Sequence, residues 1–386
     1  MIGQHEINSL NKFKPFEQLM LLASRSKVGD DEKKYMIELA NNPAMDWAAF
    51  LGTSFLNRVN GVVYKNIKEI DAINHYVKYF LKIAFIEQCE RTRIHQQEIK
   101  IIADAFENNS IRYSFMKGAV LNTIFYEPGL RISNDTDIMV DINDLDKAGE
   151  ILKELGYIQG SEKNGVICPA SKKEIMFARL NTYEIVPFIK AIGDRHLSFH
   201  EVDINFRLSN EDSTKSAREM LADTVVLHNG QFNIRTLSLE NFLMFLCIHH
   251  YREATMIFKI VRGEDLSLYK FMDIHVLLTA KKQKIDWDKL YDIAVLFDKI
   301  RDVYYTLYYT EIFFPLSVPP DIMEKFKPED ERFINQYKGR DNTDQVYNWK
   351  MDLISRAFSN DRRLEAMENI HEENERYKEI IKQLER

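Results

Sequence analysis

The chain has 386 residues, of which 45% are hydrophobic and 29% are charged. This composition supports a sizeable buried core and excludes an intrinsically disordered chain. At roughly 150 residues per domain, the length predicts two to three domains. No apolar run approaches the roughly 20 residues that span a bilayer, and the polar N-terminus lacks the apolar core of a signal peptide. We therefore expect a cytoplasmic protein with no membrane partner.

Charge and cysteine content exclude further classes. The chain carries 52 basic and 59 acidic residues, a net charge of −7, which disfavours non-specific binding to nucleic acid but is compatible with a local basic pocket. Its three cysteines are far apart and form no CxxC pair, so neither a disulfide framework nor a structural zinc site is expected.

The first hundred residues have a helical pattern. Pro43 precedes a helix that we expect to begin near Met45-Asp46-Trp47. Residues 77–106 repeat apolar side chains at helical spacing without proline or glycine, which predicts one long helix or two abutting ones.

The pattern changes at Ile111, where short strands and helices begin to alternate. We expect helices at 119–126 and 145–155, the second ended by Gly156. We expect strands at 111–115, 137–141, 174–180, 183–189 and 199–208. A turn is expected at 194–198, between the last two of these strands. From Leu239 onward the helical pattern returns and continues to the end of the chain.

These elements predict an α+β fold in which a small mixed sheet with its helices is flanked by two helical regions. We place the N-terminal helical region at 1–108, the mixed core at 109–210 and the C-terminal helical region at 211–386.

The segment around Asp135 and Asp137 carries the most chemical information. On a strand, alternate side chains project from one face about 7 Å apart, so these two carboxylates can converge on divalent cations such as Mg²⁺. A DxD tripeptide alone more often marks a turn in which Asn134 and Asp135 cap backbone groups. Phosphatases and glycosyltransferases with a DxD place it after an apolar strand, whereas here polar residues precede it.

A third carboxylate, Asp203, strengthens the metal interpretation. Asp203 alternates with the apolar residues Val202 and Ile204, so it lies on the polar face of its strand. If that strand lies beside the Asp137 strand, the three aspartates form one cluster, whose mutual repulsion requires neutralising cations. The alternative is an ordinary antiparallel strand with a polar outer face.

Upstream, Lys117 and Gly118 separate a strand from a helix. Glycine allows close approach of the backbone to a phosphate, and the following helix would offer free N–H groups. Lys117 adds a point charge, and Arg131 adds a forked donor for phosphate oxygens. A Lys-Gly pair is not specific by itself; the order of the glycine junction and the three aspartates carries the information.

That order resembles the DNA polymerase β-like nucleotidyltransferase superfamily and, within it, the bacterial family of uncharacterised nucleotidyltransferases. The segments that carry the resemblance are 115–118 (FMKG), 126–128 (YEP), 131–140 (RISNDTDIMV), 155–157 (LGY) and 202–204 (VDI), and the helical segments 45–64 and 246–278 add to it. It covers most of residues 15–310.

The resemblance implies transfer of a nucleoside monophosphate from a nucleoside triphosphate (NTP) such as ATP to a hydroxyl acceptor, with two Mg²⁺ ions and release of pyrophosphate. Asp135 and Asp137 would hold both ions, and Asp203 would hold the catalytic one and orient or deprotonate the acceptor hydroxyl. The residues expected to contact the nucleotide are Lys117, Gly118, Arg131, Asn134, Arg252 and Lys270. A small molecule, a peptide or protein side chain and a tRNA end all fit as acceptor.

The chain departs from the family pattern at two points. Lys117-Gly118 stands where the superfamily usually has Gly-Ser or Gly-Gly, although Lys-Gly is common in this family. Asn205 stands where many members have a histidine, which leaves any acid–base or acceptor-binding role of that histidine unfilled. Two alternatives therefore stay open: a degenerate nucleotide-binding or protein-interaction module without catalysis, and a glycosyltransferase that uses the DxD.

Overall fold

The computed structural model describes residues 10–210, 212–280, 284–339 and 345–384. By contacts between residues, the chain forms two compact units. We call Ile86–Phe245 the sheet unit, and Met1–Phe85 together with Leu246–Arg386 the helical unit. The domain boundaries predicted after residues 108 and 210 stay predictions.

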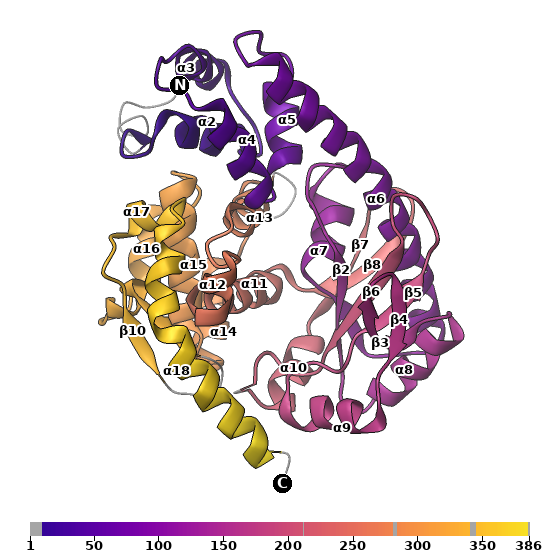
Figure 1. The fold of residues 1–386 in the computed structure, drawn as a ribbon. Helices are drawn as coiled ribbons and strands as arrows, with labels where there is room; N and C mark the ends of the chain where they lie inside the picture. The colour runs from indigo at the N-terminus through magenta and orange to yellow at the C-terminus, as the bar shows by residue number, and fades with distance from the viewer. Residues whose placement is uncertain (1–9, 211, 281–283, 340–344, 385–386) are drawn as a thin grey trace. The chain divides into compact units, whose positions relative to one another are not determined.

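The sheet unit is built on one mixed sheet of eight strands, in the order β4-β3-β5-β6-β2-β1-β8-β7 (Figure 1). The strands are β1 Tyr113–Phe115, β2 Asp135–Val140, β3 Ile158–Lys163, β4 Val166–Pro169, β5 Phe188–Ala191, β6 Phe199–Asn205, β7 Thr224–His228 and β8 Asn233–Leu237. The pairs β2–β6 and β1–β8 are parallel, and the other neighbours are antiparallel. The predicted α+β class with a small mixed sheet is confirmed.

Helices pack around this sheet because its central strands are apolar. Ile138, Val140, Val202 and Ile204 are fully buried. The helices of the sheet unit are α6 His75–Asn108, which begins in the helical unit, α7 Lys117–Val120, the π-helical turn η1 Leu121–Phe125, α8 Leu145–Glu154, α9 Lys172–Asn181 and α10 Thr214–Leu221. The long pattern over 77–106 thus forms one helix, and α8 ends as expected before Gly156, whose φ is +90°.

The helical unit contains two groups of helices separated in sequence. The first group is α2 Pro15–Ala23, α3 Asp30–Ala40, α4 Trp47–Leu56 and α5 Asn60–Ile67. The second is α11 Leu239–Thr255, which begins in the sheet unit, α12 Ile257–Arg262, α13 Leu268–Thr279, α14 Trp287–Leu296, α15 Ile300–Phe313, α16 Pro320–Phe326, the 3₁₀ turn η2 Arg332–Asn335, α17 Leu353–Ala357 and α18 Asp361–Leu384. The helix expected to begin near residues 45–47 is confirmed as α4, and its N-cap Asp46 accepts a hydrogen bond from the Ala49 amide at 2.9 Å.

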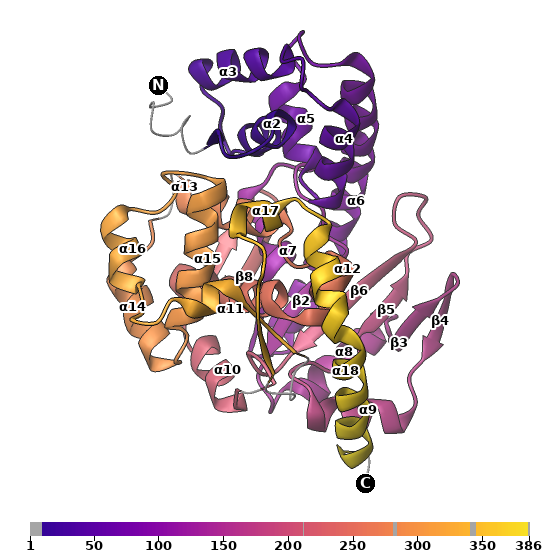
Figure 2. The same cartoon turned by 60° about the vertical axis from the view of Figure 1, so that its left-hand side comes forward.

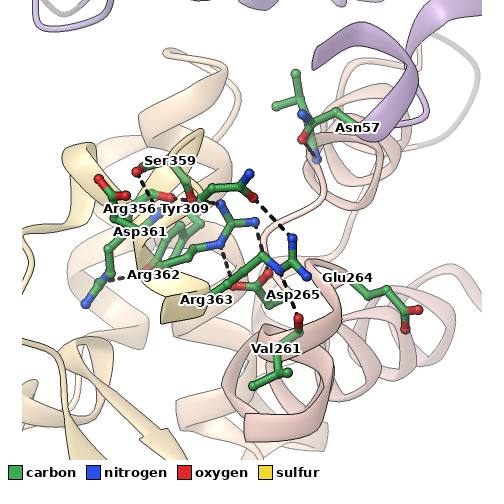
Figure 3. A network of polar contacts seen from close by, with 12 residues as sticks. Asn57, Val261, Glu264, Asp265, Tyr309, Arg356, Ser359, Asp361, Arg362 and Arg363 are labelled. Atoms are coloured by element: carbon green, nitrogen blue, oxygen red, sulfur yellow. Dashed lines mark hydrogen bonds and ion pairs between the residues drawn. The ribbon is translucent and has the colours of Figure 1, made fainter. Parts of the chain in front are cut away.

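Buried arginines attach the C-terminal segment to the rest of the helical unit (Figure 3). Arg362, on α18, donates two hydrogen bonds to the fully buried carboxylate of Asp265, at 2.9 and 3.0 Å. Arg356 is completely buried and donates to Asn335 at 2.8 Å and to the Tyr309 hydroxyl at 3.1 Å. Beside this network α18 packs on α12 in a small apolar cluster that includes Ile257, Ile260, Tyr337, Trp349 and Ala366. Polar and apolar contacts together therefore fix α18.

Three local predictions were wrong or incomplete. Residues 174–180 form part of helix α9, not a strand, because Ser171 and Glu174 form a capping box that starts a helix. The hairpin of β3 and β4, at one edge of the sheet (Figure 2), was missed although Asn164-Gly165 is a strong turn signal; both residues have positive φ.

Strands also interrupt the region expected to be helical after residue 210. The β7–β8 hairpin extends the main sheet beyond β1, and β9 Gln336–Lys338 pairs with β10 Val346–Asn348. These strands are only three to five residues long, too short for a two-residue periodicity to be distinguished from a helix. Among the residues that the structure describes, no helix is both long and apolar enough to cross a membrane.

Candidate functional site

The three aspartates lie on two adjacent parallel strands. In the register of β2 and β6, Asp137 is directly opposite Asp203, and Asp135 is opposite Glu201. Side chains that are opposite each other in a sheet project from the same face, so these four carboxylates share one face. The condition set from the sequence, that the Asp203 strand lies beside the Asp137 strand, is therefore met.

A buried polar network on the opposite face holds the two strands in this register. The Thr136 hydroxyl lies 3.0 Å from Nε2 of His200, and Nδ1 of His200 lies 2.8 Å from the Tyr157 hydroxyl. Tyr157 donates to Glu98 of α6 at 2.9 Å, and Lys190 donates to the same oxygen at 2.9 Å. Thr136 and His200 are completely buried. A slip of one residue would break this network and turn the aspartates away from their face.

Lys117 provides the positive charge nearest to the aspartates. Its Nζ lies 2.6 Å from Oδ1 of Asp137, and both side chains are mostly buried, with 17% and 5% exposed. The backbone of Lys117 has φ +41°, a strained conformation for a residue other than glycine. In this conformation the ammonium of Lys117 contacts Asp137 and neutralises part of the carboxylate charge.

Gly118 is buried and in close contact with the segment that precedes the DxD. A Cβ at this position would lie 2.2 Å from Oγ of Ser133 and 2.8 Å from Nη1 of Arg131, both closer than atoms can approach. The structure therefore brings Arg131 beside the Lys117-Gly118 junction, as phosphate binding by both would require. Asn134 is exposed.

Two further acids that sequence reasoning did not single out belong to the same cluster. Glu184 forms an isolated antiparallel bridge with Asn205 of β6 and thus lies on the β5 side of this strand. Glu201 neighbours Asp135 across the β2–β6 pair. The alternation along β6 already predicts that Glu201 shares the face of Asp203, although no role was assigned to it, whereas Glu184 precedes β5 and is brought in only by the pairing of strands.

Burial and mutual repulsion raise the pKa values of these carboxyl groups. Burial raises the pKa of Asp137 to about 6; the negative charge of Asp135 adds to this effect, and Lys117 opposes it. Burial, with the charges of Asp137, Asp135 and Glu184, raises the pKa of Asp203 well above its usual range. Burial and the neighbouring acids Asp135 and Glu184 also raise the pKa of Glu201. The cluster thus has an excess of negative charge that one lysine does not balance.

The donor set fits hard divalent cations, because it consists of carboxylate oxygens whose mutual repulsion a cation would relieve. As the side chains stand, no group of three or more His, Cys, Asp or Glu in the described part of the chain is arranged to hold a metal ion. Metal binding would require Asp135, Asp137 and Asp203 to turn toward one another and Lys117 to give up part of its contact with Asp137.

Arg252 and Lys270 belong to the helical unit, on α11 and α13. Only 1% of the Lys270 side chain is exposed, and its Nζ lies 2.9 Å from the Glu253 carboxylate. It also donates to the backbone carbonyls of Glu264 at 2.7 Å and of Asp265 at 3.0 Å. All three N–H donors of Lys270 are therefore used inside this unit, and this packing accounts for the residue without a nucleotide.

The arrangement of a mixed sheet with carboxylates on adjacent strands and a Lys-Gly junction at one side defines a nucleotidyltransferase-like core. The family of uncharacterised nucleotidyltransferases matches residues 43–315, and the chain belongs to this family. Among solved structures, the chain is similar to an antigenic nucleotidyltransferase-like protein from Paracoccidioides brasiliensis, with 15% identity, a TM-score of 0.32 and coverage of 55% of this chain and 92% of that chain. No curated protein that was compared with the chain matches it.

Proposed function

We propose that the chain is a Mg²⁺-dependent nucleotidyltransferase that transfers a nucleoside monophosphate from an NTP to a hydroxyl acceptor and releases pyrophosphate. The observation that carries the proposal is the register of β2 and β6, which sets Asp137 opposite Asp203 with Asp135 on the same face. Membership of the nucleotidyltransferase family supports the same reaction class.

The residues divide into two roles. Asp135, Asp137 and Asp203 would hold Mg²⁺, which when bound neutralises the triphosphate and stabilises charge on the oxygens around the reacting phosphorus. Lys117 and Arg131 would bind the triphosphate, because both lie at the Gly118 junction beside Asp137.

Asp203 is also the residue we assign to the acceptor. It lies on β6, one strand farther from Lys117 than Asp137, and would accept a hydrogen bond from the acceptor hydroxyl and orient it toward the phosphorus. Asn205, two residues further along the same face, replaces the family's histidine, so we assign no acid–base role to that position.

Pyrophosphate release tests the proposal. The purified protein is incubated with Mg²⁺, each of the four NTPs and a cell extract as the source of acceptor, and products are identified by their added mass. We expect Asp137→Ala and Asp203→Ala to abolish transfer. Asp146→Asn, which alters an exposed acid of the same unit, should not change the rate. Equal rates for wild type and both alanine variants would contradict the proposal.

A second function, a nucleotide-binding or interaction module without catalysis, has one observation in its favour. The ammonium of Lys117 contacts Asp137, where a catalytic cation would have to bind. Calorimetric titration with Mg²⁺ and each NTP distinguishes the two functions when it is combined with the transfer assay. Binding without any transfer, unchanged when Asp203 is replaced by Ala, would favour the module.

A further inference from the structure

We propose, on the basis of the proposed function, that the acceptor is a hydroxyl compound that carries ammonium groups, bound by Glu184 and Glu201. The observation behind this proposal is the uneven distribution of charge across the sheet. Cationic groups lie on one side of Asp137 and further carboxylates on the other, within the sheet unit.

The cationic side is that of β1 and α7. Lys117 and Gly118 begin α7, which follows β1, and Arg131 lies against Gly118. The strand order β5-β6-β2-β1 places these residues beyond β2 on one side. A triphosphate bound here would find the positive charge of Lys117 and Arg131.

The acidic side is that of β6 and β5. Glu184 bridges to the end of β6 from the β5 side, and Glu201 lies on β6 itself. Both acids act on the pKa of Asp203, so they lie close to it, and Glu162 of β3 adds to the negative potential at Glu201. Among the described residues, neither Glu184 nor Glu201 forms an ion pair with a lysine, arginine or histidine.

A buried amide on this face lacks a donor. Only 1% of Asn205 is exposed, and its Oδ1 accepts no hydrogen bond from any described residue. Asn205 is on the same face of β6 as Asp203 and Glu201 and opposite Glu184 in the bridge. A buried carbonyl oxygen without a donor is costly, which indicates that a ligand with N–H groups completes this position. Arg207, the next cation on this face, lies beyond the end of β6 with its guanidinium over the Phe206 ring.

The geometry of phosphoryl transfer links the two sides. The attacking and leaving oxygens lie on opposite sides of the reacting phosphorus. The new bond joins the acceptor oxygen to the α-phosphorus, while the bond from this phosphorus to the bridging oxygen breaks and pyrophosphate leaves with its electron pair. The hydroxyl proton passes to Asp203. If pyrophosphate leaves toward Lys117, the acceptor approaches from the side of Glu184 and Glu201.

Charge balance then selects the acceptor. The charges of two Mg²⁺ ions and of an NTP cancel, and Lys117 and Arg131 do not fully balance the three aspartates, so none of these cations is left to neutralise the two glutamates. A polyanion such as a tRNA end would be repelled at this side, and a neutral sugar would leave both carboxylates without a counter-charge. An ammonium-bearing alcohol provides N–H donors for Glu184, Glu201 and Asn205.

Calorimetry with a matched pair of probes tests the inference. The first probe is 2-deoxystreptamine, which has two ammonium groups and three hydroxyls, and the second is its neutral di-N-acetyl derivative. Both are titrated into the full-length protein with Mg²⁺ and a non-reactive α,β-methylene NTP analogue. We expect the diamine to bind at least tenfold more tightly than the neutral compound, with an affinity that falls as salt increases.

Variants locate the binding site. The isosteric double variant Glu184→Gln/Glu201→Gln should lose at least tenfold in diamine affinity, while its affinity for the Mg²⁺–NTP analogue changes less than twofold. Glu150→Gln, an exposed acid of the same unit, is the control and should bind as wild type does. The probe comparison uses the wild-type protein alone, so it stands even if the double variant folds poorly.

The outcomes separate the two proposals. The cationic acceptor would be overturned if both probes bound equally or if the diamine did not bind. It would also be overturned if tRNA displaced the diamine from the wild type and from the Glu184→Gln/Glu201→Gln variant equally well. Failure of the Mg²⁺–NTP analogue to bind, with the diamine still bound through the glutamates, would overturn the nucleotidyltransferase function and leave the cation site standing.

Discussion

The ion pair of Lys117 and Asp137 provides the sharpest test of the site. Replacing Lys117 by Met leaves the Asp137 carboxylate mostly buried and next to Asp135 and Asp203 without its counter-charge. Removal of one partner of a buried ion pair costs about 3–5 kcal/mol of stability. We therefore expect Lys117→Met to destabilise the sheet unit by that amount.

A second substitution at the same position separates charge from backbone strain. Lys117→Gly removes the same ammonium but relieves the left-handed backbone, where φ is +41°. This conformation costs a residue other than glycine about 1–2 kcal/mol. The glycine variant should therefore be more stable than the methionine variant by about 1 kcal/mol.

The assay must report on the sheet unit. All three tryptophans, Trp47, Trp287 and Trp349, lie in the helical unit, so tryptophan fluorescence does not follow it. Hydrogen exchange measured by mass spectrometry on peptides that contain β2 and β6 gives the local free energy of opening.

Addition of Mg²⁺ completes the test. If the aspartates bind the cation, Mg²⁺ should restore more protection to Lys117→Met than it adds to wild type, because in wild type the lysine already balances Asp137. A methionine variant as protected as wild type, within 1 kcal/mol, would refute the assignment of this pair as a buried counter-charge.

Three further predictions follow from single contacts. Gly118→Ala should destabilise the sheet unit by about 1–3 kcal/mol in the same exchange assay, since the new methyl group would overlap Oγ of Ser133. Arg362→Met should cost about 3–5 kcal/mol in urea unfolding followed by tryptophan fluorescence, because the carboxylate of Asp265 would be left buried and unpaired. Burial lowers the pKa of His275 from 6.5 to about 3, so the unfolded chain binds more protons between these values and stability falls as the pH falls. As the pH falls from 6 to 4, the free energy of unfolding of His275→Gln should therefore decrease by about 1.4 kcal/mol per pH unit less than that of wild type.

Each of these predictions has a matched control in the chain. Gly52→Ala meets no neighbouring atom and should not destabilise the helical unit, to which it belongs, in urea unfolding followed by tryptophan fluorescence. Arg332→Met breaks an exposed ion pair with Asp330 in the helical unit and should cost less than about 1 kcal/mol in the same fluorescence assay. His371→Gln alters an exposed histidine of the helical unit and should leave the pH slope unchanged. A control that matches its test variant would contradict the reasoning from burial.

Strong local signals were interpreted correctly from the sequence. The apolar period without proline or glycine predicted α6, and Pro43 predicted the start of a new helix near residues 45–47, where α4 begins. The prediction failed where two local signals competed. Residues 174–180 contain β-forming side chains and were predicted as a strand, but the capping box at Ser171 starts a helix there. The Asn164-Gly165 pair is a local turn signal, but the β3–β4 hairpin that it joins was not predicted.

The sequence by itself determined which carboxylates face together, because the alternation along a strand is a local property. It placed Asp135 with Asp137, and Asp203 on the polar face of its own strand. Only the tertiary structure decided that the two strands are neighbours in parallel register, and that Lys117, 20 residues before Asp137, supplies its counter-charge. The tertiary structure also brings Glu184 to the cluster and buries Lys270 away from solvent. The physical reason is that strand order and charge pairing depend on how distant segments pack, which no local pattern encodes.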